Sequence, residues 1–274
     1  MNNINNQIID DGYNSSYITS LLVALFYKSS SVDDILNMNP VDNKFIYALE
    51  FIKIRFIEPL RRGFSIHSET INEFRNYIVN CDWKNNVDEM LIEHNILEFY
   101  KFFINKIESN NIKFLRLMDD EIIGENCMSV IELSIPPNVS SMNLSDMFKL
   151  WINNNIILEK YKYKIYDIPY LLPFYINREN NKDTKINIMY KIKLFNVNDE
   201  LQDKLIWTIH SMICYDKDIG YYSVIKYGSK WIHISDKNIP SINKLDMYDE
   251  NDVLKLSKDI VFVFYTANND CKLN

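Results

Sequence analysis

Apolar residues recur at helical spacing through the first 110 residues of this 274-residue chain. Behind the candidate N-cap residues Asn14, Ser15 and Ser16, the spacing predicts a buried amphipathic helix from about Ser16 to Tyr27. Further helices are expected over residues 45–52, ending before Pro59, and over residues 70–79 and 87–107. The apolar face of the last helix contains Met90, Leu91, Ile96, Leu97, Phe99, Phe102 and Phe103.

From about residue 111 onward the period shortens to two, which is typical of strands. Strands are expected over residues 112–118, 128–135, 156–166, 171–176, 185–197, 204–214, 221–226, 231–234 and 259–266. A short helix is expected over residues 144–151, and a hairpin turn is centred on Gly228 and Ser229. Helices followed by strands predict an α+β fold, with a helical subdomain over residues 1–110 and an antiparallel sheet subdomain over residues 111–274.

The composition indicates a protein with a substantial core and an excess of negative charge. Hydrophobic residues make up 47% of the chain, aromatic residues 14%, and the formal net charge is −7. Because that charge repels phosphate backbones, nucleic acid is not an expected partner. The longest apolar run, Leu21–Tyr27, is far shorter than the roughly 20 residues of a membrane span, and the polar N-terminus does not resemble a signal peptide. We therefore expect an intracellular, cytoplasmic protein with no membrane span.

The cysteines and glycines point to no cofactor. The four cysteines are scattered, with neither a CxxC pair nor a Cys/His spacing that would hold zinc, so we expect free buried thiols; they are Cys81, Cys127, Cys214 and Cys271. The five glycines form no phosphate-binding loop, and neither nucleotide-binding motif is present. No metal and no cofactor are expected.

Three segments carry a family resemblance when they are taken together. The first is Asp11–Leu22 (DGYNSSYITSLL), which is similar to a cysteine box N-x-G-N-T-C-Y-M-N-S-x-L. The second joins residues 210–211 (HS), 220–223 (GYYS) and 230–236 (KWIHISD), similar to a histidine box H-S-G…G-H-Y…K-W-Y-x-F-D-D. The third is Ile260–Tyr265 (IVFVFY), similar to a closing strand A-Y-x-L-F-Y. In this order and spacing the chain resembles the ubiquitin-specific protease family over essentially its whole length.

The resemblance implies a papain-like α+β fold, in a compact form without zinc-bearing fingers, and it assigns catalytic positions. The position of the nucleophilic cysteine falls on Ser16. The position of the histidine base falls on Tyr221 if the glycines are matched, or on Gly220 if the tyrosines are matched. The position that orients the histidine falls on Ser235, which is followed by Asp236, and the position of the oxyanion-assisting Asn falls on Asp11.

These substitutions predict an inactive site. A neutral phenol, with a pKa of about 10, is a poor base at neutral pH, and the negative charge of Asp11 would oppose an oxyanion. Loss of both nucleophile and base typically removes on the order of a million-fold in turnover. A cysteine-to-serine change engineered to trap a complex would account for Ser16 but not for Tyr221 and Ser235. Apart from the resemblance, Ser16 is expected to be a helix N-cap, and Asp119, Asp120 and Glu121 to be solvated loop charges.

We therefore expect an inactive pseudoenzyme that acts by binding ubiquitin, a ubiquitin-like modifier or another protein. The first alternative is a hydrolase that still cleaves after the ubiquitin C-terminus, and the second is a structural or assembly protein that keeps only the fold. The abundance of Asn, Ile, Lys and Tyr is typical of an A+T-rich genome, and with the compact core it suggests a large DNA virus of eukaryotes. A viral protein of this kind would work in the host cytoplasm or be packaged in the particle.

Overall fold

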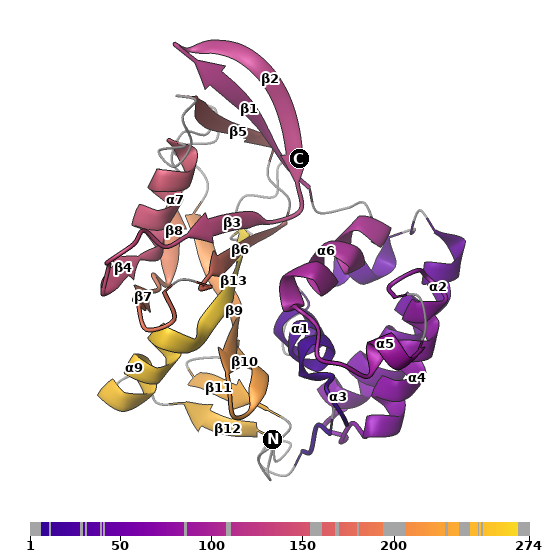
Figure 1. Ribbon diagram of the computed structural model, residues 1–274. Coiled ribbons are helices and arrows are strands. Elements are labelled where there is room, and N and C mark those ends of the chain that lie inside the picture. Colours follow the sequence, from indigo (N-terminus) through magenta and orange to yellow (C-terminus); the bar gives the residue numbers. More distant parts are fainter. Residues whose placement is uncertain are drawn as a thin grey trace. The chain divides into compact units, whose positions relative to one another are not determined.

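The computed structural model has an α+β fold, as the order of helical and strand periodicity predicts (Figure 1). It divides into two compact units, the first made of Met1–Ser109 and Ser211–Asp252, the second of Asn110–His210 and Val253–Asn274. The expected division into two domains at residue 110 stays a prediction. The structure describes residues 7–10, 12–27, 30, 32–38, 40, 42–84, 87–107, 111–153, 161–167, 170–179, 181–193, 206–227, 230–235, 242–245, 247 and 249–267.

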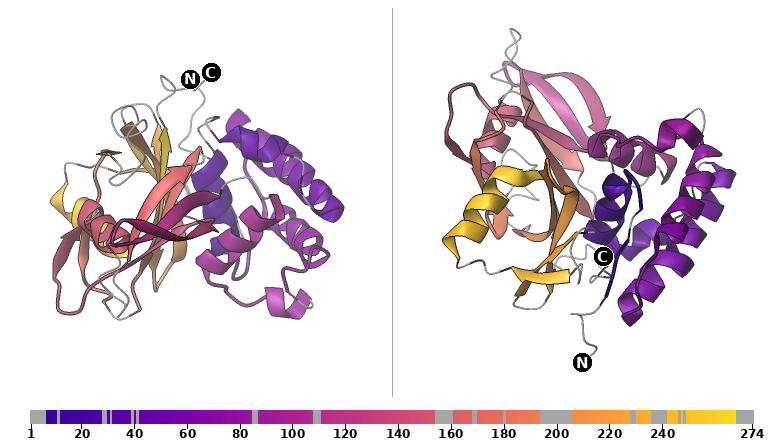
Figure 2. Two further views of the ribbon diagram at one scale, coloured as in Figure 1. Left: turned by 90° about the horizontal axis from the view of Figure 1, so that it is seen from above. Right: turned by 60° about the horizontal axis from the view of Figure 1, so that its bottom comes forward.

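Helix α1 (Ser16–Phe26) is central to the first unit, and every one of its residues is buried. The helices around it, drawn in indigo to magenta and seen from two more directions in Figure 2, are η2 (Asp33–Asn37), α2 (Asn43–Phe51), η3 (Ile52–Ile57), α3 (Glu58–Arg62), α4 (Ser68–Val79), α5 (Val87–Met90) and α6 (Ile96–Ile107). Most residues of α1 are apolar and all are buried, so it lies inside its unit and not on its surface.

The expectation that a helix ends before Pro59 is wrong. α2 continues through the π-helical segment η3 into α3, and the chain leaves the helix only at Gly63, whose φ of 93° gives a left-handed cap. Pro59 occupies an early position of α3, where the missing N–H of a proline costs little, and the widened π turn precedes it. The sequence pattern shows the proline but not the wider turn that accommodates it.

The expected single helix over residues 87–107 is interrupted at residues 91–95. Asn95 caps the N-terminus of α6, because its side-chain oxygen accepts a hydrogen bond of 2.8 Å from the backbone N–H of Leu97. Leu91, expected on the apolar face, is 42% exposed. The break leaves Glu93 and His94 in the connection between α5 and α6, within the first unit.

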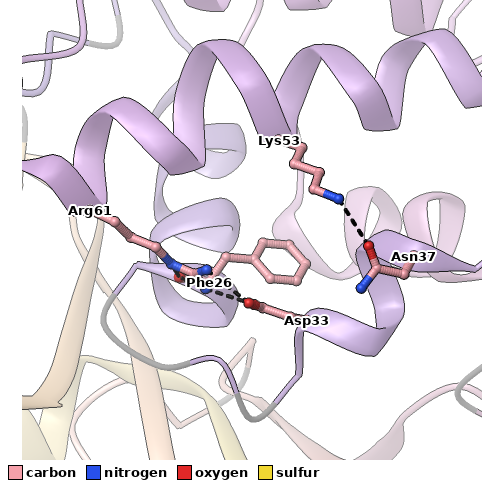
Figure 3. A network of polar contacts seen from close by, with 5 residues as sticks. All are labelled: Phe26, Asp33, Asn37, Lys53 and Arg61. Carbon is pink, nitrogen blue, oxygen red and sulfur yellow. Dashed lines mark hydrogen bonds and ion pairs between the residues drawn. The ribbon is translucent and has the colours of Figure 1, made fainter.

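The C-terminal end of α1 is held by Arg61 of α3 (Figure 3). Its Nε and Nη2 atoms donate hydrogen bonds of 2.8 and 2.6 Å to the carbonyl of Phe26, the last residue of α1. The same guanidinium donates to both carboxylate oxygens of Asp33, at 2.8 and 2.6 Å. A carbonyl left unpaired by the end of the helix therefore receives a charged donor.

The first unit also contains an antiparallel sheet with the strand order β12-β11-β10-β9. Its strands are β10 (Gly220–Tyr227), β11 (Lys230–Ile234), β12 (Ile242–Leu245) and the part of β9 (Ile206–Asp216) from Ser211 onward. α1 packs on β10, and the buried hydroxyl of Ser223 donates a hydrogen bond of 2.8 Å to the carbonyl of Ser20. The expected turn at Gly228 and Ser229 lies outside the described residues.

The second unit consists mainly of short strands. β2 (Glu121–Met128), β1 (Ile112–Met118) and β5 (Lys162–Asp167) form one sheet in that order, and β13 (Ile260–Ala267), β6 (Leu171–Asn177) and β3 (Ile131–Ser134) lie side by side. β3 pairs with β6 in parallel, whereas β6 and β13 are antiparallel. The remaining elements are β4 (Ser141–Asn143), β7 (Lys185–Asn187), β8 (Lys191–Lys193), α7 (Leu144–Ile152) and the part of α9 (Glu250–Asp259) from Val253 onward.

Three expectations for the second unit are wrong. The strand expected over residues 185–197 is two strands, β7 and β8, with residues 188–190 between them. Glu121, expected in a loop, begins β2, because Asp119 and Asp120 both adopt positive φ and turn the chain back in two residues. Cys127, expected to be buried, is exposed on β2, whereas Cys81 and Cys214 are free and buried as expected. Among the described residues, no helix is long and apolar enough to cross a membrane.

Candidate active site

The candidate site lies at the N-terminal end of α1, within the first unit. Ser15 is the N-cap residue and Ser16 is the first residue of the helix, so the expectation that Ser16 is the N-cap is wrong. The Ser16 hydroxyl donates a hydrogen bond of 3.2 Å to Glu93 Oε1 and accepts one of 3.1 Å from the backbone N–H of Tyr221. Two positions that the resemblance selects, 205 residues apart in the chain, are therefore in direct contact.

Gly220 allows this close approach of β10 to α1. Its φ is +79°, and a Cβ atom built on it would lie 2.9 Å from Ser16 Oγ and 3.3 Å from Glu93 Oε1. A side chain at this position would collide with the hydroxyl, and its backbone would be strained. The glycine is thus required both by its dihedral angle and by the space around it.

The phenol of Tyr221 is not one of the hydrogen-bond partners of the Ser16 hydroxyl. Its phenol oxygen accepts a long hydrogen bond of 3.4 Å from the backbone N–H of Ile96, at the start of α6. Its ring lies 4.9 Å from the ring of Tyr215, measured between centroids, at an angle of 57°. Tyr221 therefore bridges β10 and α6, and its backbone amide bonds to the hydroxyl.

Ser235 is buried and lines a small pocket together with Tyr221. The pocket is about the size of one water molecule, and Thr19, Ser20 and Ser223 also line it. The Thr19 hydroxyl is buried and forms no hydrogen bond within the described part of the chain. The structure therefore brings Ser235 close to Tyr221, whereas Asp11 and Asp236 lie outside the described residues.

Glu93 is the site residue that the sequence analysis missed. It lies in the break between α5 and α6, its side chain is exposed, and it reaches Ser16 from 77 residues away. The polar run of Glu93, His94 and Asn95 inside an apolar pattern is the signal that could have revealed it. That signal indicates a break in the helix, but it does not indicate which residue the carboxylate meets.

The loop that precedes α1 is held by Arg75 of α4, a second residue that the sequence analysis did not select. Arg75 is buried, and its Nη2 atom donates hydrogen bonds of 2.6 and 2.9 Å to the carbonyls of Tyr13 and Asn14. Asn14 has a φ of 52°, and its side chain donates to the carbonyl of Leu91 at 3.0 Å. The buried guanidinium therefore fixes the turn from which Ser16 enters the helix.

No histidine of the described residues bonds to the Ser16 hydroxyl, whose two partners are Glu93 and the Tyr221 amide. His94 is the neighbour of Glu93, but its Nε2 atom lies 2.7 Å from the carbonyl of Glu89, and its ring packs edge-on against Tyr17. Burial lowers the pKa of His94, which favours the neutral imidazole. His233 packs edge-on against the ring of Tyr222, at 4.5 Å between centroids.

The mouth of the site carries negative charge. Partial burial, and then the carboxylates of Glu93 and Asp216, raise the pKa of Tyr215. Tyr215 itself is 41% exposed. Within the described ranges no group of three or more His, Cys, Asp or Glu residues is arranged to hold a metal ion.

The comparisons with known proteins identify the fold of the chain from its structure. They do not identify a family from its sequence. No family model matches the chain, and no curated protein matches it. Solved structures match over 96% of the chain: the SAGA DUB module Ubp8/Sgf11/Sus1/Sgf73 bound to monoubiquitin (13% identity, TM-score 0.62, 69% of that chain) and the same module bound to ubiquitin aldehyde (14%, 0.64, 70%). A further structure of the Ubp8-Sgf11-Sgf73-Sus1 module matches with 14% identity, a TM-score of 0.60 and 68% of that chain covered.

At this level of identity the comparison concerns the fold alone. Ubp8 is a ubiquitin-specific-protease-type hydrolase, and the expected α+β architecture of that class is confirmed, whereas the loss of the catalytic positions stays a prediction. The chain has the fold of a ubiquitin-specific protease.

Proposed function

We propose that this chain is a catalytically inactive deubiquitinase-like protein that acts by binding ubiquitin, a ubiquitin-like modifier or another protein. The proposal rests on one observation above the others. The hydroxyl of Ser16, at the position that the resemblance gives to the nucleophile, bonds to a carboxylate and to a backbone amide, and neither partner is an imidazole.

The chemistry of these partners favours an unreactive hydroxyl. An alkyl hydroxyl needs a well-placed base to become a nucleophile, and an ordinary carboxylate is a weak base toward it. The hydrogen bond from the Tyr221 amide also occupies the oxygen that would attack a carbonyl. A negative charge at Glu93 would in addition oppose the oxyanion of an acyl-transfer intermediate.

Ubiquitin is the first partner to test, because two of the similar structures contain ubiquitin or ubiquitin aldehyde. A titration of isotope-labelled ubiquitin with the whole chain, followed by NMR, should give saturable shifts. If ubiquitin shows no shifts at high concentration, ubiquitin binding is excluded, and the alternative of a structural or assembly protein that keeps only the fold is favoured.

The absence of activity is tested with a fluorogenic ubiquitin substrate and an electrophilic C-terminal ubiquitin probe. Exposed Cys127 would react with the probe nonspecifically, so the assay uses Cys127→Ser as its background. We expect no turnover and no labelling for the native Ser16 chain, and at most slow labelling after Ser16→Cys, since no imidazole is supplied. Turnover by the native chain would overturn the proposal.

A second candidate function is hydrolysis after the ubiquitin C-terminus, and the bond of 3.2 Å between Ser16 and Glu93 is the observation that favours it. In this alternative Glu93 would be the base that accepts the hydroxyl proton. Any native turnover should then disappear in both Ser16→Ala and Glu93→Gln. A viral source, and action in the host cytoplasm or in the particle, belong to the proposal and are independent of this choice.

A further inference from the structure

Glu93 is a fixed carboxylate for which the described part of the chain supplies no cation. Its Oε1 atom is held by Ser16 at 3.2 Å, yet its side chain is exposed, and no lysine or arginine of the described residues forms an ion pair with it. Other positioned carboxylates have such a partner: Asp33 with Arg61 at 2.6 Å, Asp42 with Lys106 at 3.0 Å and Asp167 with Lys113 at 2.9 Å. The carboxylate at the candidate site is therefore ordered but remains open to a charge from outside.

Two tyrosines lie on the paired strands β9 and β10 at the candidate site. Tyr215 and Tyr221 have ring centroids 4.9 Å apart, and Tyr215 is 41% exposed. Tyr221 is connected to the carboxylate through Ser16, whose hydroxyl accepts a hydrogen bond of 3.1 Å from the Tyr221 amide and donates one of 3.2 Å to Glu93. Aromatic faces attract cations, and a carboxylate beside them strengthens that attraction.

Gly220 packs closely beside the carboxylate. Because a Cβ atom at this position would lie 3.3 Å from Glu93 Oε1, any other residue would place its side chain over that oxygen. The close packing of Gly220 leaves no room for a side chain between β10 and Oε1, so a ligand reaches the Glu93 carboxylate from its solvent-exposed side. The positive end of α1, at Ser16, additionally favours an anion at this place.

We propose that Glu93, Tyr215 and Tyr221 form a binding site for a positively charged side chain, lysine or arginine, of a partner protein. The carboxylate supplies the ionic contact, and the tyrosine rings cover the aliphatic stem and the charged head. The inference deepens the proposed function, because it names the chemical group that a binding protein with this altered site would recognise. It also gives Glu93, which has no catalytic role in the inactive site proposed above, a reason to be ordered.

The test uses small probes, so that it does not depend on ubiquitin. The whole chain, labelled with ¹⁵N, is titrated with N-acetyl-lysine methylamide, N-acetyl-arginine methylamide and the uncharged N-acetyl-norleucine methylamide. The amide signals of Ser16, Gly220 and Tyr221 should shift saturably with the two cationic probes, with half-saturation on the order of tens of millimolar. Norleucine should cause no shift, and added salt should weaken the cationic probes.

Variants assign the effect to the residues named. Glu93→Gln should weaken cation binding about fivefold or more, and Tyr215→Leu should weaken it about threefold. Glu98→Gln, the same change of charge at an exposed residue of α6, is the matched control and should leave binding unchanged. Equal shifts with norleucine, or equal binding by Glu93→Gln, would overturn the inference. If ubiquitin does not bind, binding of the cationic probes still supports the cation site. If the cationic probes do not bind, the cation site is excluded, and the proposed binding of ubiquitin is still tested by its own titration.

Discussion

At the C-terminal end of α1 the chain supplies both a carboxylate and its cation, whereas at the N-terminal end its described residues supply the carboxylate alone. Arg61 joins the last carbonyl of the helix to Asp33 through four hydrogen bonds, and both charged side chains are less than a third exposed. At the N-terminal end, the Ser16 hydroxyl accepts a hydrogen bond from the Tyr221 amide and donates one to Glu93. The side chain of Glu93 is exposed. The same helix thus has a closed end, where the Asp33 carboxylate is paired with Arg61, and an open end, where the Glu93 carboxylate has no cation among the described residues.

The difference separates structural polar groups from groups that are available for function. A charged pair whose donors and acceptors are satisfied inside the protein contributes to stability and offers little to a ligand. An ordered carboxylate without an internal cation contributes little to stability. Because its position is already fixed, binding of a ligand does not lose free energy to ordering that side chain. If this comparison is correct, substitutions at the two ends should change different observables.

The largest effect is expected from Arg61→Met. It removes the donors of the Phe26 carbonyl and leaves Asp33 without its cation, so the free energy of unfolding should fall by about 3 kcal/mol. Urea unfolding followed by circular dichroism measures this. Lys53→Met is the matched control, because Lys53 makes a single exposed hydrogen bond of 3.0 Å to Asn37, and it should cost less than about 0.5 kcal/mol (Figure 3). Similar losses in the two variants would contradict the structural role of Arg61.

Next in size is Gly220→Ala, at the open end. The left-handed φ of +79° and the approach of 2.9 Å to Ser16 Oγ together should lower the free energy of unfolding by about 2 kcal/mol. Adding Ser16→Ala should recover the part caused by the collision, and the double-mutant cycle separates it from the backbone strain. The control is Gly124→Ala, where only the flexible end of the Arg116 side chain is in the way. Full additivity in the cycle would mean that Gly220 and Ser16 are not in contact.

The sequence predicts the scaffold of this site better than its chemistry. Helical spacing places α1 to within a residue, and the resemblance selects Ser16 and Tyr221, which the structure brings into contact. The bounds of α1 follow from a local pattern, and the choice of Ser16 and Tyr221 follows from the resemblance to a known family. The resemblance leaves the histidine position open between Tyr221 and Gly220, and the contact with the Ser16 hydroxyl comes from the Tyr221 backbone amide.

Glu93 shows why the rest could not be predicted. Apolar periodicity continues across residues 87–107, and only the cap formed by Asn95 interrupts the helix there. The contact of Glu93 with Ser16 joins residues 77 positions apart, and no sequence period reports such a contact. The continuation of the helix through Pro59 is a similar case, since a π turn changes the hydrogen-bond pattern without a distinct composition.

A smaller effect is expected on the pKa of a thiol introduced at the open end. In a background with Cys127→Ser and Cys271→Ser, Ser16→Cys places a thiol beside the Glu93 carboxylate, which disfavours the thiolate. Its pKa should be about 1 unit higher than in the same chain with Glu93→Gln. The pH dependence of iodoacetamide alkylation measures both values, with Glu98→Gln as the control. Equal thiol pKa values with and without the Glu93→Gln substitution would mean that the carboxylate does not act on position 16.

The smallest effect is expected from Glu93→Gln itself, and it gives the most direct comparison of the two ends. Because Glu93 is exposed and has no internal cation among the described residues, the substitution should change the free energy of unfolding by less than about 0.5 kcal/mol. Asp33→Asn is the same chemical change at the closed end, where the carboxylate accepts two bonds from Arg61, and it should cost about 1 to 2 kcal/mol. If Glu93→Gln destabilised the protein as much as Asp33→Asn, Glu93 would be a structural residue, and its carboxylate would not be available to a partner.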